Sequence, residues 1–454
     1  MEKDTTVGTE RIAALFDSGT FVETGAYLKR SNGDKTGVVC GYGAVNGKLT
    51  YAFAQDSDRQ KGAFDALQAK KIGALYEMAL KNGAPIVGMF DSAGAYVTDG
   101  AAAMSAYGAL LGSISRASGV VPQIAVISGV CTGLAATAAS MFDLTVTVKE
   151  TSKLSVNAPF LIGKEVADAA YAGANGLSSI CAENNEEMLS TVRSLIDLLP
   201  SNSEDGVVAE EITDDINRVC NGNGLSGKSL MEAVADLGMV VEIGAEYAPE
   251  MVTGFARIGG VCCGLIANEA SVNGGVLTGE GAKKAAKLLS FCDSFSIPVV
   301  TLTDSEGVAV SLAEESAALA AQLGKLAMAY ATATTAKITV VTGKAYGASF
   351  TLMGSRALGA DLVYALPTSS ISAMSPESAV AFLWNDRITE DKSRADLVEE
   401  WKNTCASPAE AAADGSVDDV INASELRARI CSAVYMLLMK CADTPARKHC
   451  NLPL

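Results

Sequence analysis

The chain repeats itself with an almost constant offset, and this duplication limits its possible folds more than any other feature. Short motifs of the first half recur 213 or 214 residues further along. The recurring motifs are Ala69-Lys70-Lys71 with Ala282-Lys283-Lys284, Pro85 with Pro298, Asp91-Ser92 with Asp304-Ser305, Gly94 with Gly307, and Gly129 and Gly133 with Gly343 and Gly347. Chance does not supply a collinear series of this kind, so the sequence predicts two copies of one fold.

The sequence predicts the same order of secondary-structure elements in each copy. A helix with apolar residues at helical spacing leads through a proline into an apolar strand, and a second helix and a second strand follow. The predicted strands span residues 85–90 and 123–128 in the first copy, and 337–342 is the second strand of the other copy. A glycine-rich turn and a helix of small residues come next. Strands that alternate with helices indicate an α/β fold with largely parallel strands and right-handed crossovers.

The two copies are joined by a polar stretch between residues 199 and 228. Its Asn-Gly dipeptides, at Asn221-Gly222 and Asn223-Gly224, favour turns. We place the boundary near residue 225, which gives an N-terminal domain of residues 1–225 and a C-terminal domain of residues 226–454. Residues 210–219 are a candidate amphipathic helix within this stretch.

Composition excludes several classes of function. A net charge of −17 and a pI near 4.6 argue against nucleic acid or an anionic membrane as the main partner. The 11 cysteines lack metal-ligand spacing, so we expect no metal site. The start of the chain does not look like a signal peptide, and a reducing cytoplasm is the expected compartment. The uncharged stretch between Arg116 and Asp143 contains too many Gly, Ser and Thr for a spanning helix, so a strand, a turn and a helix are expected there.

The chain has a single histidine, His449, close to its C-terminus. A Ser–His–Asp triad or a His-rich metal site therefore has no basis in this sequence. If the protein is an enzyme, its chemistry must depend on carboxylates, lysines, tyrosines or the backbone itself.

Two equivalent strand-to-helix turns are the candidate functional segments. They read Gly129-Val-Cys-Thr-Gly-Leu134 and Gly343-Lys-Ala-Tyr-Gly-Ala-Ser349. Glycine lets the backbone approach a ligand, and the first N–H groups of the following helix lack intrahelical partners. Two such N–H groups form an oxyanion hole. The alternative is that these glycines only allow close packing of strand against helix. Their duplication favours a site for two oxyanions, in which the second substrate itself accepts the proton.

Longer motifs carry a resemblance to a known family. They are Tyr51-Ala-Phe-Ala-Gln-Asp56, Tyr247-Ala-Pro-Glu-Met-Val-Thr-Gly-Phe-Ala-Arg-Ile258, Gly343-Lys-Ala-Tyr-Gly347, Gly415-Ser-Val-Asp-Asp-Val-Ile421 and Arg447-Lys-His-Cys-Asn-Leu-Pro-Leu454. From about Thr9 to its end, the chain resembles the carboxyltransferase (β) subunits of biotin-dependent acyl-CoA carboxylases. It equally resembles the related subunits of methylmalonyl-CoA and glutaconyl-CoA decarboxylases.

This resemblance implies a fold, an assembly and a reaction. The fold is α/β, with two tandem crotonase-like domains built from repeated ββα units. The assembly is a homo-oligomer, commonly a hexamer, with sites between the N-domain of one subunit and the C-domain of its partner. Gly133 and Leu134 are implied to hold the ureido oxygen of biotin, and Ala348 and Ser349 the thioester oxygen of a propionyl- or methylmalonyl-type acyl-CoA. Biotin, not a protein base, is implied to take up the α-proton.

The resemblance also implies substrate contacts and partners. Gly94, Tyr346, Gly347 and Thr351 are expected to contact the acyl-CoA, although core packing also explains Tyr346 and an ordinary helical role explains Thr351. No Ala-Met-Lys-Met sequence occurs, so biotin is expected on a separate biotin carboxyl carrier protein. Biotin carboxylase or the subunits of a sodium-pump decarboxylase are further expected partners, the latter placing the chain at the edge of a membrane complex.

The lysine pairs of the two repeated helices have a structural interpretation. The pairs Lys70-Lys71 and Lys283-Lys284 are expected on solvated helix faces, with contacts to CoA phosphates as the alternative.

Five segments depart from the family pattern, and one of them, near residues 171–179, has none of the histidines expected there. Leu134 replaces a second glycine, Tyr96 replaces an arginine, Glu306 replaces a proline, and Ala348-Ser349 replaces Gly-Ala. Leu134 and Glu306 motivate an alternative function, a divergent non-catalytic paralogue that assembles with an active partner subunit. A CoA-thioester hydrolase or hydratase on the same fold is a weaker option, because the chain lacks a convincing pair of catalytic carboxylates.

Overall fold

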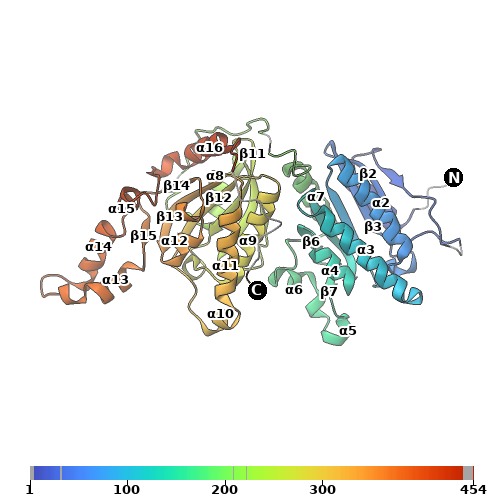
Figure 1. Ribbon diagram of the computed structural model, residues 1–454, viewed down its shortest axis with the longest axis horizontal. Coiled ribbons are helices and arrows are strands. Elements are labelled where there is room, and N and C mark those ends of the chain that lie inside the picture. The colour runs from blue at the N-terminus through green and yellow to red at the C-terminus, as the bar shows by residue number, and fades with distance from the viewer. Residues whose placement is uncertain (1–4, 31–32, 208, 221, 443–452, 454) are drawn as a thin grey trace. The chain divides into compact units, whose positions relative to one another are not determined.

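The computed structural model describes residues 5–30, 33–207, 209–220, 222–442 and 453. The chain divides into two compact units, Met1–Gly206 and Val207–Leu454 (Figure 1). Within the described residues, each unit is built on one eight-stranded mixed sheet with helices packed on it. The prediction of two α/β copies is confirmed.

The sheet of the first unit has the order β1-β2-β3-β4-β5-β6-β8. Strands β1, β2 and β3 pair antiparallel, and every later pairing is parallel. Strand β7 pairs with the end of β5. The strands are β1 (Val22–Thr24), β2 (Val38–Val45), β3 (Lys48–Gln55), β4 (Ile86–Ser92), β5 (Gln123–Thr132), β6 (Leu144–Val148), β7 (Lys153–Ser155) and β8 (Ile180–Ala182).

The second unit repeats this topology strand for strand. Its sheet has the order β9-β10-β11-β12-β13-β14-β16, and β15 pairs with the end of β13. The first three strands again pair antiparallel and the rest parallel. The strands are β9 (Val240–Ile243), β10 (Met251–Ile258), β11 (Val261–Asn268), β12 (Val299–Ser305), β13 (Lys337–Tyr346), β14 (Leu362–Ala365), β15 (Ser370–Ser372) and β16 (Asp419–Val420).

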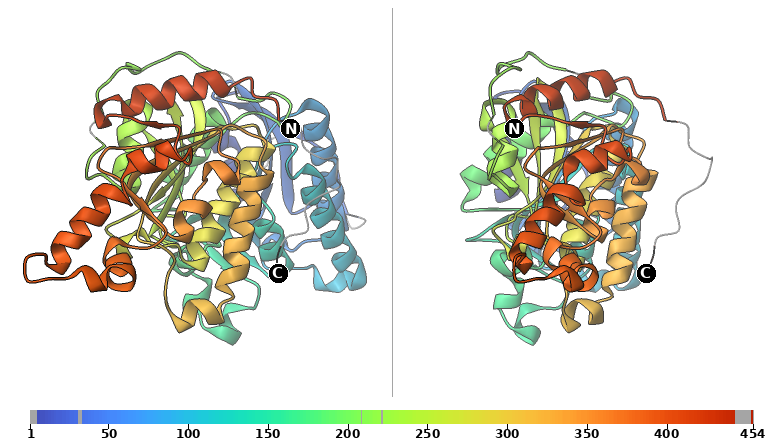
Figure 2. Two further views of the ribbon diagram at one scale, coloured as in Figure 1. Left: turned by 60° about the vertical axis from the view of Figure 1, so that its left-hand side comes forward. Right: turned by 90° about the vertical axis from the view of Figure 1, so that its left-hand side faces the viewer.

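Two long helices lie side by side on each sheet, α2 with α3 in the first unit and α9 with α11 in the second (Figure 2). The helices of the first unit are α1 (Val7–Leu15), α2 (Ala66–Asn82), α3 (Ala101–Ala117), α4 (Leu134–Ser140), α5 (Pro159–Ile162), α6 (Ala169–Ala174) and α7 (Asn185–Leu198). Those of the second are α8 (Gly227–Val234), α9 (Gly279–Ser294), α10 (Leu312–Ser316), α11 (Leu319–Thr332), α12 (Ala348–Leu352), α13 (Pro376–Leu383), α14 (Arg394–Thr404), α15 (Pro408–Ala413) and α16 (Leu426–Leu437).

Strands β5 and β13 are four residues longer than predicted, and each has a glycine inside it. A Cβ atom on Gly129 would lie 2.3 Å from the Asp91 carboxylate, and one on Gly343 would lie 2.3 Å from Asp304. The Asp91 carboxylate accepts the N–H of Val130 at 3.2 Å, and the equivalent bond in the second unit is 2.8 Å. Close packing therefore explains these two glycines.

The uncharged stretch between residues 116 and 143 forms the end of α3, then β5, then α4, as predicted. In the part of the chain that the structure describes, no helix is both long enough and apolar enough to cross a lipid bilayer.

The helix proposed at residues 210–219 is absent, and these described residues form a bend, a turn and chain without regular secondary structure. The N–H of Asn217 donates to the Asp215 carboxylate at 2.9 Å, and Nε of Arg218 donates to Asp214 at 3.0 Å. Short polar side chains that bond nearby backbone groups compete with helix formation.

A fully buried arginine attaches this segment to the second unit. Arg427 donates to the carbonyl of Asp215 at 3.2 Å, to the carbonyl of Val234 at 2.5 Å and to the carboxylate of Asp236 at 2.7 Å. The segment around Asp215 therefore packs with the second unit. The chain passes from the first compact unit to the second between residues 206 and 207, whereas the sequence places the domain boundary near residue 225.

One lysine of each repeated pair is buried, so the prediction of solvated faces is wrong for them. Lys71 is 4% exposed, and its Nζ contacts the Val38 carbonyl at 3.1 Å and Glu23 at 3.0 Å. Lys284 is 8% exposed, and its Nζ donates to the Tyr247 carbonyl at 2.7 Å. Burial lowers the pKa of Lys284 to about 8. Both lysines hold a strand or loop on their helix.

Candidate functional site

The two predicted turns adopt the same backbone conformation in the two units. Strand β5 ends at Thr132, Gly133 has φ 64° and ψ −134°, and α4 follows. Strand β13 ends at Tyr346, Gly347 has φ 58° and ψ −135°, and α12 follows. Glycine reaches this region without the steric cost of a Cβ atom. Gly133 and Gly347 therefore redirect the chain from strand to helix.

The amide groups of both turn glycines are already used within the fold. Gly133 donates its N–H to the carbonyls of Ser155 at 3.2 Å and Val156 at 3.0 Å, at the end of β7. Gly347 donates its N–H to the carbonyl of Ser372 at 2.8 Å, at the end of β15. These bonds fasten each turn to the short strand beside it.

The next two amides in each turn lack a partner in the described part of the fold. The N–H groups of Leu134 and Ala135, and those of Ala348 and Ser349, donate to no protein acceptor within the described residues. As the first residues of a helix, they have no intrahelical partner. Symmetry between the units therefore pairs Ala348 and Ser349 with Leu134 and Ala135.

Exposure follows the same symmetry. Leu134 is 37% exposed and Ala348 is exposed, whereas Ala135 and Ser349 are buried. The Ser349 hydroxyl donates to the carbonyl of Tyr346 at 2.8 Å. This buried, engaged hydroxyl is poorly placed to act as a nucleophile.

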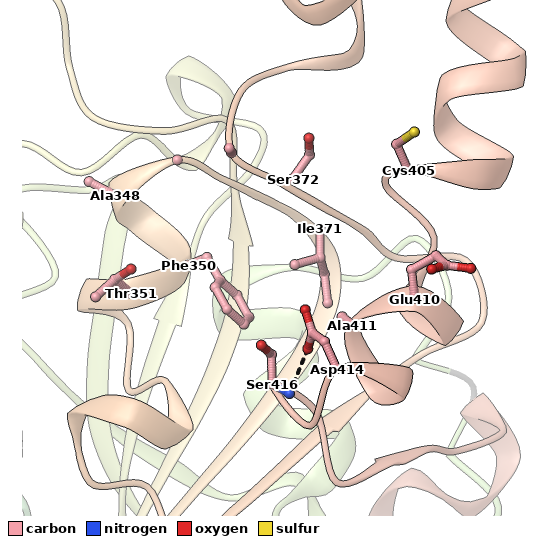
Figure 3. Close-up of a pocket in the computed structure, with 12 residues that line it drawn as sticks. Ala348, Phe350, Thr351, Ile371, Ser372, Cys405, Glu410, Ala411, Asp414 and Ser416 are labelled. Atoms are coloured by element: carbon pink, nitrogen blue, oxygen red, sulfur yellow. Dashed lines mark hydrogen bonds between the residues drawn. The ribbon is translucent and has the colours of Figure 1, made fainter.

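In the second unit a pocket of about 570 Å³ opens beside α12 (Figure 3). Its lining residues come from the β13–α12 turn and α12, from β15 and the residue after it, from the residue after α14, and from α15 and the chain after it. They are Gly347, Ala348, Phe350, Thr351, Ile371, Ser372, Ala373, Cys405, Glu410, Ala411, Asp414 and Ser416. An exposed backbone amide therefore lies at the edge of a cavity large enough for a small acyl group.

The charges that depart from the family pattern have partners in the fold. The guanidinium of Arg30 lies 4.4 Å from the centre of the Tyr96 ring. Arg30, which belongs to another segment, therefore places a cation beside the position where the family has an arginine. Glu306 pairs with Nζ of Lys344 at 2.6 Å, and this hydrogen bond raises the pKa of Lys344. The extra negative charge of Glu306 is thereby balanced.

The aspartates that brace the two turns differ in their surroundings. Asp91 pairs with Arg11 at 2.6 Å. Asp304 accepts the backbone N–H of Lys344 at 2.8 Å, and burial raises its pKa. Among the described residues, no group of His, Cys, Asp or Glu side chains is arranged to hold a metal ion.

Comparison with known proteins identifies the family. The model of the carboxyl transferase domain matches residues 2–452, almost the whole chain. The chain belongs to the carboxyl transferase family. The resemblance inferred from its motifs is therefore confirmed, and so is the enzyme class that it implies, a biotin-dependent acyl-CoA carboxyltransferase.

Relatives of this carboxyltransferase span nearly its full length. The methylmalonyl-CoA decarboxylase subunit alpha of Veillonella parvula is 35% identical, with 98% of this chain and 92% of the relative covered. A putative propionyl-CoA carboxylase beta chain of Bacillus subtilis is 34% identical, with 100% and 94% covered. A crystal structure of transcarboxylase 12S, described as a hexamer assembly with methylmalonyl-CoA and methylmalonic acid bound, is 33% identical with a TM-score of 0.92 and covers 99% and 93%. This match confirms the predicted crotonase-like, two-domain fold.

The predicted site residues of the carboxyltransferase fall into two groups. Gly347, Ala348 and Thr351 line the pocket, whereas Tyr346 and Ser349 are buried and do not line it. The others belong to the first unit, Gly133 and Leu134 at the turn, and Gly94 after β4. Gly94 has φ 106° with open space at its Cα, and its N–H donates to Oγ of Ser92 at 3.2 Å.

The far wall of the pocket was not predicted from the sequence of the carboxyltransferase. Cys405, Glu410 and Asp414 lie more than fifty residues beyond the turn, on short helices with no motif of their own. The one sequence signal for this wall of the pocket was the family-like stretch 415–421, which contains Ser416.

Proposed function

We propose that this chain transfers a carboxyl group between carrier-bound biotin and a short-chain acyl-CoA of the propionyl or methylmalonyl type. The observation that carries the proposal is the pair of unpartnered amides that recurs at both strand-to-helix turns. The names of the relatives, which include methylmalonyl-CoA decarboxylase and propionyl-CoA carboxylase subunits, support the same substrate class.

Backbone amides supply what this chemistry requires. Loss of a proton or of CO2 from the α-carbon of an acyl-CoA places negative charge on the thioester oxygen. In our proposal the N–H groups of Ala348 and Ser349 stabilise that charge, and each such donor contributes on the order of 10²- to 10³-fold to the rate. Because these groups are fixed by the turn, they need no reorganisation during the reaction.

The first unit offers a second pair of donors for biotin. Biotin carries CO2, and its ureido oxygen needs hydrogen-bond donors. The amides of Leu134 and Ala135 fit this need, because both lack a protein acceptor within the described residues. We place the biotin-side pair here, one residue beyond the pair named from the family resemblance, since Gly133 already donates to two carbonyls.

The proposal includes partners and an assembly. Biotin would arrive on a separate carrier protein, and biotin carboxylase or sodium-pump decarboxylase subunits would complete the system in the cytoplasm. The hexamer described for transcarboxylase 12S supports a homo-oligomer with sites shared between subunits.

The test is decarboxylation by the purified protein with methylmalonyl-CoA or malonyl-CoA and either free biotin or a biotinylated carrier. We expect propionyl-CoA or acetyl-CoA to form only when biotin is present, as followed by chromatography of the CoA esters. A folded oligomer that shows no biotin-dependent turnover with either substrate contradicts the proposal.

The side chain of Leu134 favours one alternative, a non-catalytic paralogue. This side chain is 37% exposed at the turn where the family has glycine, and its bulk narrows the approach to the amides. A non-catalytic chain would be inactive alone and would co-purify with a second carboxyltransferase subunit. Biotin-dependent turnover by the homo-oligomer eliminates this alternative.

A further inference from the structure

An arginine from the first helix of the chain clamps the strand that leads into the first turn. Nη1 of Arg11 donates to one oxygen of the Asp91 carboxylate at 2.6 Å, and Nη2 donates to the carbonyl of Ser128 at 3.3 Å. The other oxygen of Asp91 accepts the N–H of Val130 at 3.2 Å. One guanidinium and the carboxylate that it holds therefore fix the peptide groups on both sides of Gly129.

Asp91 is suited to transmit the effect of Arg11, because its backbone is held in place. The N–H of Asp91 donates to Oε1 of the buried Gln55 on β3 at 3.1 Å. The side chain of Asp91 is 13% exposed and that of Arg11 is 26% exposed. A charge-assisted hydrogen bond in such a partly buried place orients a carboxylate more firmly than an exposed ion pair does. Without the guanidinium, this carboxylate is free to turn away from the N–H of Val130.

The clamp connects to the free amides through the strand itself. Val130 begins the stretch of β5 that pairs with β7, and the pairing continues to Thr132. The N–H of Gly133 then donates to the carbonyls of Ser155 and Val156. Rigid hydrogen-bonded elements of this kind carry a displacement from one end to the other. A shift at Val130 therefore reaches the first residues of α4.

The second unit has the same turn without the arginine. A Cβ atom on Gly8 of α1, or on Gly227 of α8, would lie 3.0 Å from the Cβ atom of the acidic residue that directly follows β3 or β11. The two helices therefore correspond at these glycines. Three residues further on, the first unit has Arg11, whereas the second has Leu230, buried in the apolar core. Because both turns have the same backbone conformation, the fold of the turn does not require the arginine.

We propose that Arg11 is a positioning residue for the free amides of the first turn. The proposal rests on the proposed function, in which the N–H groups of Leu134 and Ala135 bind an oxyanion. Arg11 holds the strand end from which these amides extend. Its positive charge also balances the Asp91 carboxylate, whose negative charge would otherwise oppose an oxyanion at the same turn. Arg11 itself acts only through these neighbours and does not contact the reacting atoms.

The first experiment measures biotin-dependent decarboxylation of methylmalonyl-CoA by the intact oligomer. Arg11→Met removes the guanidinium, and we expect kcat to fall about 10- to 10²-fold, because displaced donors stabilise the transition state poorly. The KM values for methylmalonyl-CoA and biotin should stay within about 3-fold of the wild type. Arg11→Lys keeps the charge but not the planar fork, so its kcat should lie between the two. A kcat of Arg11→Lys no higher than that of Arg11→Met would overturn the role of the charge.

Arg193→Met is the matched control for the loss of a partly exposed arginine. Arg193 donates to the Asp17 carboxylate and to the carbonyl of Leu15, each at 2.6 Å, and its side chain is 28% exposed. None of its described partners lies on β4, β5 or α4. We expect Arg193→Met to keep kcat within about 3-fold of the wild type, because this arginine does not reach the turn. Urea unfolding shows that each variant is folded under the conditions of the assay.

Hydrogen exchange tests the clamp without turnover. Exchange at the Val130 amide, resolved by mass spectrometry of fragmented peptides across residues 128–134, should be at least about 10-fold faster in Arg11→Met than in the wild type. It should be unchanged in Arg193→Met. Residues 342–348 of the second turn should exchange at the wild-type rate in both variants and serve as the internal control.

The outcomes separate the inference from the proposed function. Unchanged exchange at Val130 in Arg11→Met overturns the inference, and so does an equal kcat in folded Arg11→Met and Arg193→Met. A wild type without biotin-dependent turnover contradicts the proposed function, and the exchange at Val130 then decides on the clamp by itself.

Discussion

Replacement of Ala348 by proline is expected to remove one donor of the proposed oxyanion hole and to leave the fold of the turn intact. Ala348 is the first residue of α12, and its N–H has no protein acceptor within the described residues. Proline is well tolerated at this position of a helix, because the missing N–H is not part of the helical hydrogen bonds. Proline favours an extended conformation in the residue before it. Gly347, at φ 58° and ψ −135°, has the mirror image of that conformation. Glycine adopts this mirror image without cost.

The expected loss of kcat can be estimated from the role of the donor. Removal of one oxyanion-hole donor lowers kcat by about 10²- to 10³-fold, or about 2.7–4 kcal/mol. The KM for acyl-CoA should change little, since the donor acts on charge that develops in the transition state. The free energy of unfolding should change by less than about 1 kcal/mol, because Ala348 is exposed and the turn accepts proline.

The assay is biotin-dependent decarboxylation of methylmalonyl-CoA, together with urea unfolding of each variant. Ala348→Ser keeps the N–H and is the matched control, with kcat expected within about 3-fold of the wild type. Ala348→Pro that folds normally and retains kcat within about 5-fold of the control would refute the assignment of this amide.

Three further predictions concern stability. Arg427→Met leaves buried Asp236 without its ion pair and should lower the free energy of unfolding, measured in urea, by about 3–5 kcal/mol. A loss below about 1 kcal/mol would contradict this prediction. Burial lowers the pKa of Lys284 to about 8, below its value of about 10.4 in the unfolded chain, so the unfolded state binds more protons between these values. The stability of the wild type should therefore rise from pH 8 to pH 10, and Lys284→Met should lack this rise; parallel pH profiles would contradict the reasoning. Gly129→Ala forces a Cβ atom to 2.3 Å from Asp91 and should cost more than Gly133→Ala. No atom lies within 4 Å of a Cβ at Gly133, so Gly133→Ala adds only backbone strain at φ 64° and ψ −134°, about 1–3 kcal/mol. Equal losses of stability in the two glycine variants would disprove the packing role of Gly129.

The sequence predicted the framework of this carboxyltransferase because its repeat is collinear. Equal spacing of prolines, aspartates and glycines requires the same succession of strands and helices in each half, and the two sheets have identical topology. The turns were also evident, since glycine at 133 and 347 is a local requirement of positive φ. Family motifs added the enzyme class, because they extend over nearly the whole chain.

The sequence did not distinguish the roles of glycines that belong to the same turn. Gly129 and Gly343 allow an aspartate of the neighbouring strand to pack closely, whereas Gly133 and Gly347 bend the chain. The difference depends on which side chain the next strand brings alongside, and this is a property of the sheet. For the same reason, the burial of Lys71 was missed, since its partners lie on β1 and β2.

By itself, then, the sequence determined the duplication, the order of elements and the position of the two turns, because each of these depends on residues close together in the chain. Only the tertiary structure decided which amides remain free, because the carbonyls that engage Gly133 and Gly347 arrive on β7 and β15 through parallel pairing. It also brought Arg30 to Tyr96 and Glu410 to the pocket of Ala348. Contacts between segments this far apart depend on how strands and helices pack, and no local pattern of residues encodes that packing.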